Sequence, residues 1–266
     1  MRIYAMTNQK GGVGKTANTI NTGAALAEKS EQNPEQKRVL LVDFDPQGHM
    51  SEALGVEETP DDKTLRMALV GEWRNADPRQ IIVQRSEYLH VIPTNVDMHL
   101  LERSLYTVAD RERRLSRFLE KVDDDYDVCL IDCAPSLGVI TDCSLYAARK
   151  REGKGRSGIV VPVEAEDSSV RALRLLLRQI GLLSEDMDIV LDVLGLVPSR
   201  FDVRDGNVVT SMLEAFRGLG EPAVIGEIRK RTIIREAWRA KQTIIEHAPQ
   251  SDAADWYRDL AKAVDA

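Results

Sequence analysis

A loop with the chemistry to bind phosphate lies near the start of the chain, in the run Lys10-Gly11-Gly12-Val13-Gly14-Lys15-Thr16. Its glycines allow backbone N–H groups to curl round an anion, and the positive end of a following helix would face the same anion. The Lys15 ammonium can reach β- and γ-phosphates, and the Thr16 hydroxyl can ligate Mg²⁺. The plainer alternative is a glycine-rich turn with two solvated lysines.

A strand and a helix are predicted on either side of this loop. Residues 2–6 are mostly apolar and indicate a short buried strand, whereas residues 16–28 are rich in alanine and carry apolar side chains at helical spacing. Strand, glycine loop and helix form the arrangement in which such a loop holds phosphate. The loop is therefore predicted to bind a nucleotide.

Acidic residues follow two further predicted strands. The apolar run 37–43 ends in Asp43-Phe44-Asp45-Pro46-Gln47-Gly48, and the run 126–132 ends in Asp132. Open α/β sheets bind ligands at the carboxyl ends of their strands, so these carboxylates are expected beside the loop. Asp132 fits a carboxylate that holds Mg²⁺ through a water. The alternatives are a turn or helix cap at Asp45-Pro46, and a buried strand that merely ends in Asp132.

Strands alternate with helices along the whole chain. Further strands are expected over residues 89–95, 157–164 and 190–197, further helices over 64–71, 96–121, 168–183 and 207–216, and an exposed loop over 30–36. This alternation predicts an α/β fold of the P-loop NTPase type, a mostly parallel twisted sheet with helices on both faces. Residues 1–266 are expected to form a single domain, because no linker is visible.

Composition limits the environment of the protein. The 266 residues contain no run of 18 or more apolar residues and no export leader at Met1, so a cytoplasmic protein without a membrane span is expected. The three cysteines are expected to be reduced core thiols, and the four histidines lack the spacing of metal ligands. With a net charge of −7, any binding of nucleic acid or anionic lipid must come from a local basic patch.

The loop resembles the deviant Walker A motif, K-G-G-x-G-K-[ST], of the ParA/MinD family of ATPases. Gln9 stands where the ordinary pattern has its first glycine, and Lys10 is additional. Residues 43–48 are similar to the family's D-x-D-P-Q-G, residues 91–95 to V-I-P-x-N, and residues 130–138 to L-I-D-C-P-P-S-L-G, with Ala134 replacing the first proline. The resemblance extends from residue 3 to about residue 264.

This resemblance implies roles for individual residues. Lys10 would cross a dimer interface to the phosphates of the partner's nucleotide, Asp45 would position the attacking water, and Asp132 would hold Mg²⁺ through water together with Thr16. Ala17 stands where the family commonly has a second threonine. The implied cofactors are ATP and Mg²⁺. The implied nucleotide contacts are Gly11, Gly12, Val13, Gly14, Lys15, Thr16, Ala17, Ser199 and Arg229.

Two later segments resemble family loops that contact DNA and lie near the adenine. Residues 198–204 are similar to L-T-M-F-D-A-R, and residues 228–237 to I-P-R-N-V-R-L-S-E-A, with Ile233 in the slot of a DNA-contacting arginine. Residues 228–241 contain six basic residues and one acidic residue. Arg231, Arg235 and Arg239 are expected on one helical face. The plainer alternative is a solvated helix face. The implied DNA-binding residues are Arg204, Lys230, Arg231 and Arg235.

The family's function would then be an ATP-dependent homodimer that binds non-specific DNA on the nucleoid and partitions a plasmid or chromosome with a centromere-binding partner protein. No helix-turn-helix precedes the first strand, as in the short form of the family. A second possibility is a ParA-like scaffold that positions another cargo.

A third possibility, a MinD-like membrane-surface ATPase, requires a basic amphipathic helix at the C-terminus. The tail over residues 252–266 contains four aspartates against Arg258 and Lys262, so an anionic membrane should repel it. Its stripe of Trp256, Leu260 and Val264 is expected to pack onto the sheet instead.

Overall fold

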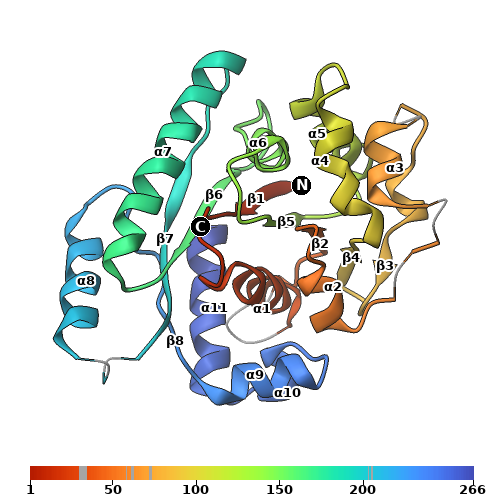
Figure 1. Ribbon diagram of the computed structural model, residues 1–266. Helices are drawn as coiled ribbons and strands as arrows, with labels where there is room; N and C mark the ends of the chain where they lie inside the picture. The colour runs from red at the N-terminus through yellow and green to blue at the C-terminus, as the bar shows by residue number, and fades with distance from the viewer. Residues whose placement is uncertain (30–34, 58, 61–62, 72–73, 203, 205) are drawn as a thin grey trace.

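The predicted strands form one eight-stranded sheet in the computed structural model, which describes residues 1–266 except 30–34, 58, 61–62, 72–73, 203 and 205 (Figure 1). Its strands are β1 (Arg2–Met6), β2 (Val39–Phe44), β3 (Val83–Gln84), β4 (Leu89–Ile92), β5 (Val128–Cys133), β6 (Gly158–Val163), β7 (Val193–Phe201) and β8 (Ile228–Arg229). They lie in the order β3-β4-β2-β5-β1-β6-β7-β8, and within the described residues β3 alone runs antiparallel to its neighbour. The predicted mostly parallel α/β fold is confirmed.

Helices cover both faces of this sheet, as Figure 1 shows. Every residue of β2 and β5 is buried, which explains why these strands are continuous apolar runs without alternation. One face is covered by α1 (Lys15–Ala27), α2 (His49–Leu54), α9 (Thr232–Arg239), α10 (Ile244–His247) and α11 (Asp252–Asp265). The other is covered by α3 (Leu65–Val70), α4 (Leu101–Leu105), α5 (Arg114–Leu119), α6 (Val139–Ala147), α7 (Asp167–Met187) and α8 (Asn207–Gly218).

The strand register brings the predicted chemical groups to one edge of the sheet. Met6, the last residue of β1, is paired with Asp132 of β5, and Asp132 is also paired with Asp43 of β2. The phosphate loop begins just after β1, so the parallel strands deliver the loop and both carboxylates to the same edge.

The continuous helix predicted over residues 96–121 is wrong. The chain forms α4 and α5 with a turn between them, and Asp110 has a φ of 54° in the left-handed region. Aspartate tolerates this conformation better than most residues, which allows both short helices to bury their leucines against the same core. Leu100, predicted as a core residue, is 49% exposed.

The C-terminal helix α11 packs chiefly against α1 and β8. Leu260 and Val264 are buried, as the stripe predicts, in one core cluster with Met6 of β1, Val160 of β6 and Val197 of β7, and α11 lies beside α1 on this face of the sheet (Figure 1). The expected packing of this stripe onto the sheet is therefore confirmed, and α1 shares the contact. Most of the loop expected over residues 30–36 lies outside the described residues.

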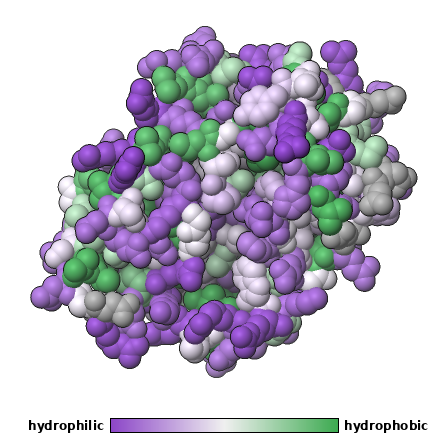
Figure 2. Space-filling view, in the orientation of Figure 1, coloured by the Kyte–Doolittle hydropathy of each residue, from purple (hydrophilic) through white to green (hydrophobic). Residues whose placement is uncertain are grey.

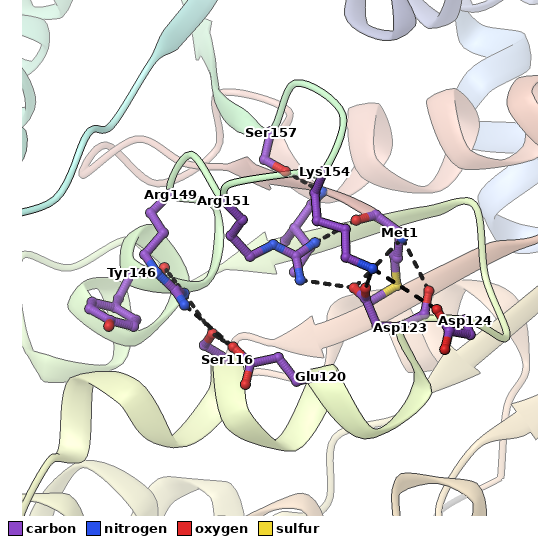
Figure 3. Close-up of polar contacts among 11 residues, drawn as sticks. Met1, Ser116, Glu120, Asp123, Asp124, Tyr146, Arg149, Arg151, Lys154 and Ser157 are labelled. Carbon is purple, nitrogen blue, oxygen red and sulfur yellow. Dashed lines mark hydrogen bonds and ion pairs between the residues drawn. The ribbon is translucent and has the colours of Figure 1, made fainter.

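Ion pairs tie the segments at the opposite edge of the sheet, where β5 and β6 begin (Figure 3). Arg151 and Lys154 both contact the carboxylate of Asp123, at 2.8 and 2.5 Å. Lys154 also lies 3.9 Å from Asp124. This cluster lies at the end of the strands opposite to the phosphate loop.

Candidate nucleotide-binding site

The phosphate loop runs from the end of β1 to the first turn of α1. Gly12 and Gly14 have φ angles of 80° and 92°, in the region where a side chain would strain the backbone. Asn8 fixes the loop to the sheet: its side chain accepts a hydrogen bond from the backbone N–H of Lys10 (3.1 Å) and donates one to the carbonyl of Pro162 (2.7 Å). The predicted strand, glycine loop and helix are therefore present.

Lys15 is the first residue of α1 and is 6% exposed. Its Nζ donates a hydrogen bond across the loop to the carbonyl of Lys10 at 3.2 Å, and no ion pair joins it to a carboxylate among the described residues. Burial lowers the pKa of this ammonium, although the charges of Asp132 and Asp45 act in the opposite direction. A buried cation at a helix N-terminus, without a counter-charge in contact, is suited to bind an anion.

The paired carboxylates Asp43 and Asp132 are both fully buried. Ser51 donates two hydrogen bonds to Oδ2 of Asp43, from its backbone N–H (2.8 Å) and its hydroxyl (2.6 Å). Within the described part of the chain, Oδ1 of Asp43 and both carboxylate oxygens of Asp132 have no hydrogen-bond partner. Burial raises the pKa of Asp43 to about 6, and burial together with the charge of Asp43 raises the pKa of Asp132 well above its ordinary value.

These unpaired oxygens fit a divalent cation. A buried carboxylate without a partner is costly, and a cation with its waters would both pair the oxygens and favour the ionised form. No group of three or more histidine, cysteine, aspartate or glutamate side chains able to hold a metal occurs in the described ranges. Mg²⁺ would therefore depend on the Thr16 hydroxyl, waters held by Asp132 and phosphate oxygens, which is a usual mode of its binding.

Asp45 lies at the wall of the pocket in front of the loop and is 6% exposed. Its Oδ1 accepts a hydrogen bond from the backbone N–H of Gln47 (3.0 Å), and its carbonyl accepts one from Gly48 (3.0 Å). The turn considered as an alternative is thus present. Because the carboxylate also lines the pocket, the turn aims it at the site.

Lys10 is directed to the segment between β6 and α7 of its own chain. Its Nζ lies 2.7 Å from Glu164 and 2.6 Å from Glu166, and donates a hydrogen bond to the Ser168 hydroxyl at 3.1 Å. Unlike Lys15, Lys10 does not line the pocket of its own chain. The two lysines of the motif therefore have different surroundings.

A pocket of about 590 Å³ lies in front of the loop, within the range usual for small-molecule sites. Its floor is formed by Gly11, Gly12, Gly14, Lys15, Thr16, Ala17 and Asn18. The rest of its lining comes from Asp45, Gln47, His49, Pro135, Arg200, Ile228, Arg229, Lys230, Arg231, Ile234, Arg235, Trp238, Arg239 and Tyr257. One cavity thus connects the phosphate loop with a basic rim from β8 and α9.

Most predicted nucleotide contacts meet in this pocket, but two do not. Val13 is fully buried beneath the loop, and Ser199 is 1% exposed, with its hydroxyl accepting a hydrogen bond from Asn18 (2.9 Å). The Ser199 side chain is thus held against α1, and its contact with a nucleotide stays a prediction. Arg229, by contrast, lines the pocket as predicted.

Several lining residues were missed by sequence reasoning. Gln47 and His49 follow Asp45 closely, so the motif itself was a signal for them. Arg200, Trp238 and Tyr257 come from distant segments, and no local spacing marks them. Their place depends on how β7, α9 and α11 pack around α1.

The predicted DNA-binding residues divide into two groups. Lys230, Arg231 and Arg235 are exposed at the basic rim of the pocket, whereas Arg204 lies outside it and pairs with Asp202 at 2.6 Å. The expected helical row is corrected: Arg231 precedes α9 in extended conformation and pairs with Asp252 at 2.7 Å. Arg235 and Arg239 remain on the helix. The extended backbone allows Arg231 to reach α11.

Comparison with known proteins establishes the family. Residues 1–193 match the family described as AAA domain. The chain is 35% identical to the sporulation initiation inhibitor protein Soj of Bacillus subtilis, covering 99% of this chain and 98% of Soj. It is 33% identical to the chromosome partitioning protein ParA of Myxococcus xanthus, covering 87% of this chain and 76% of that protein. The chain belongs to the ParA/Soj family of ATPases.

A solved structure of a similar protein has the same fold as this ParA/Soj chain. The protein described as cobyrinic acid a,c-diamide synthase from Mycobacterium smegmatis, with bound ADP and magnesium, is 31% identical with a TM-score of 0.77. The alignment covers 98% of this chain and 92% of that one. The AAA domain match includes the loop and the carboxylates, while the basic rim after residue 193 is covered by the alignment with Soj.

Proposed function

We propose that this ParA/Soj chain, as a single domain over residues 1–266, is an ATP-dependent dimerising ATPase that binds non-specific DNA. With a centromere-binding partner protein it would partition a plasmid or chromosome, acting in the cytoplasm on the nucleoid. The observation that carries the proposal is the shared pocket, in which the phosphate loop and Asp45 lie beside the basic rim of β8 and α9. Nucleotide bound at the loop can therefore influence the surface that would meet DNA.

The residues of the pocket would bind ATP and support its hydrolysis. The loop N–H groups and Lys15 would hold the phosphates, and Ala17 would supply no hydroxyl to the α-phosphate, which weakens affinity without altering the chemistry. Bound Mg²⁺ would neutralise charge on the phosphate oxygens. Thr16 would ligate this Mg²⁺ and Asp132 would hold one of its waters. Asp45, fixed by its turn, would orient the attacking water.

The contacts of Lys10 lead to a prediction about dimerisation. In the family resemblance this lysine serves the partner's nucleotide, and here it is held by Glu164 and Glu166 rather than by its own pocket. Lys10→Ala should therefore leave ATP binding by the monomer within about threefold of wild type, because Lys15 is untouched. It should prevent the ATP-bound dimer and its turnover. Light scattering with and without ATP, beside a nucleotide titration, measures both effects.

Lys154→Ala is the matched control, since Lys154 also contacts two carboxylates but at the opposite edge of the sheet (Figure 3). It should dimerise as wild type does. Normal ATP-induced dimerisation of Lys10→Ala would contradict the assigned role.

DNA binding must overcome the net charge of −7. The rim of one chain offers Lys230, Arg231 and Arg235, and Arg231 is partly neutralised by Asp252. ATP-dependent dimerisation would join two rims into a larger basic surface. Binding should then show little sequence preference and weaken steeply with salt, because each neutralised phosphate contributes about −0.9 to the slope of log affinity against log salt.

Arg231→Ala combined with Arg235→Ala should lower DNA affinity at least ~10-fold and flatten the salt dependence, since phosphate contacts are lost. Arg204→Ala should likewise lower DNA affinity and flatten its salt dependence. Dimerisation should remain intact in both. Fluorescence anisotropy with a labelled duplex at several salt concentrations measures the change, with Arg174→Ala on the exposed face of α7 as control. An unchanged salt slope would remove these arginines from the DNA surface.

The MinD-like membrane alternative is weakened by the surroundings of α11. Its apolar side chains Leu260 and Val264 are already buried against the core, so they are not presented to a membrane. None of the helices in the described ranges has an apolar stretch long enough to cross a bilayer. Figure 2 shows one face covered mainly by hydrophilic side chains, with small separate hydrophobic patches.

The cargo-positioning alternative uses the same ATPase chemistry and differs in the partner protein. A small basic DNA-binding protein encoded beside this chain would favour partition of DNA over another cargo.

A further inference from the structure

Arg200 stands at the carboxyl end of β7 in an unusual backbone conformation. Its φ is 61°, in the left-handed region that residues with a side chain rarely adopt. The register between β7 and β8 shifts at the same point: Ser199 is opposite Ile228 and Phe201 is opposite Arg229, so Arg200 is an extra residue. Bulges of this kind redirect a side chain, and strained residues concentrate at functional sites.

The redirected side chain lies along the phosphate loop. Its Nη1 donates a hydrogen bond to the carbonyl of Gly12. A Cβ placed on Gly14 would lie 3.7 Å from Cγ and Cδ of Arg200, and one on Gly12 would lie 3.6 Å from Nη1. Arg200 also lines the nucleotide pocket. The bulge therefore brings a guanidinium to the loop from a strand distant in the sequence.

This guanidinium has capacity for a further ligand. No carboxylate in the described part of the chain forms an ion pair with it, in contrast to Arg204, which pairs with Asp202, and Arg231, which pairs with Asp252. A guanidinium carries five N–H donors in a planar fork that matches phosphate oxygens, and the Gly12 carbonyl occupies few of them. The family pattern L-T-M-F-D-A-R has methionine in this slot, so the charge is a departure of this chain.

The position along the loop indicates which phosphate the guanidinium would meet. By the family resemblance, position 17 would meet the α-phosphate, and Ala17 lies within α1, whereas Gly12 lies near the start of the loop beside Lys10. A triphosphate held by the loop would extend its terminal phosphate toward that start.

We propose that Arg200 is a phosphate-binding residue of the nucleotide site, contributed within the same chain by the β7 bulge, and that it favours nucleoside triphosphate over diphosphate. The inference rests on the proposed ATP binding and deepens it. Arg200 would hold the loop through Gly12 with one part of its fork and the terminal phosphate with the other.

The test compares the equilibrium affinities for ATP and ADP, each with Mg²⁺, in three variants. Arg200→Met keeps an unbranched side chain and the backbone strain but removes the charge, so ATP affinity should fall about 10-fold or more while ADP affinity changes less than about threefold. Arg200→Lys should recover part of the ATP affinity, because it restores charge without the fork. Arg200→Gly relieves the left-handed strain, so it should fold at least as stably as wild type and still lose ATP affinity. Arg174→Met, an exposed arginine on α7, is the control for loss of charge and should match wild type.

Unchanged ATP affinity in Arg200→Gly, or equal loss of ATP and ADP affinity, would overturn the proposal, since the second result is that of a residue supporting the loop alone. Circular dichroism of each variant confirms folding, and if Arg200→Met is unfolded the glycine and lysine variants decide. Failure of the wild-type protein to bind ATP would instead refute the proposed function.

Discussion

Lys15→Ala should abolish ATP binding at concentrations that saturate the wild-type protein. Lys15 is 6% exposed, and truncating one partner of a buried charge pair costs about 2–5 kcal/mol, so affinity should fall at least ~30-fold. The expected effect on stability has the opposite sign. Burial disfavours the isolated charge in the free protein and so lowers the pKa of Lys15. Calorimetric titration and thermal unfolding of the nucleotide-free protein measure the two effects.

The unfolding temperature of Lys15→Ala should therefore equal or exceed that of the wild type without nucleotide. Added ATP should stabilise the wild-type protein by mass action and leave the variant unchanged. Lys154→Ala, at the opposite edge of the sheet, should respond to ATP as the wild type does. ATP-dependent stabilisation of Lys15→Ala would show that the phosphates are held elsewhere.

Asp45→Asn should bind ATP and dimerise but lose turnover by at least ~10²-fold, because general-base and water-positioning groups contribute on that scale. Asparagine keeps a side-chain oxygen, so the hydrogen bond from the Gln47 backbone N–H and the turn should persist. What is removed is the negative charge at the pocket wall. Phosphate release, measured with DNA and with the partner protein once identified, reports the loss.

Asp186→Asn, an exposed acid on α7, is the control for removing a carboxylate and should keep wild-type turnover. If Asp45→Asn kept near wild-type turnover, Asp45 would not be the residue that positions the attacking water. Asp43 would then be the next candidate, since its Oδ1 is buried and lacks a hydrogen-bond partner within the described residues.

The centre of the site was predictable because its parts are local in sequence. The loop of residues 10–16 joins the strand and helix that position it, and Asp43 and Asp132 follow apolar runs predicted as parallel strands, which the structure pairs with each other. Strand direction alone then places loop and carboxylates at one edge. For the same reason the mostly parallel fold could be predicted without knowledge of any long-range contact.

The rim of the site was not predictable in this way. Arg200 reaches the loop through a bulge, and Arg231 leaves the helical row because it precedes α9. Trp238 lines the pocket because α9 packs against α2 and α10. These placements depend on tertiary packing between distant segments. The spacing of leucines also predicted a continuous helix over residues 96–121, because this spacing does not reveal the turn at Asp110.

The measurement that tests the central claim most directly is the binding of the wild-type protein to a labelled duplex of arbitrary sequence, with Mg²⁺ and either a slowly hydrolysed ATP analogue or ADP. We expect binding with the ATP analogue, at protein concentrations where ADP supports none, and a steep loss of affinity as salt is raised. A second duplex of unrelated sequence should bind equally well. Equal affinity with the two nucleotides, or no binding with either, would contradict a nucleotide-switched DNA-binding ATPase.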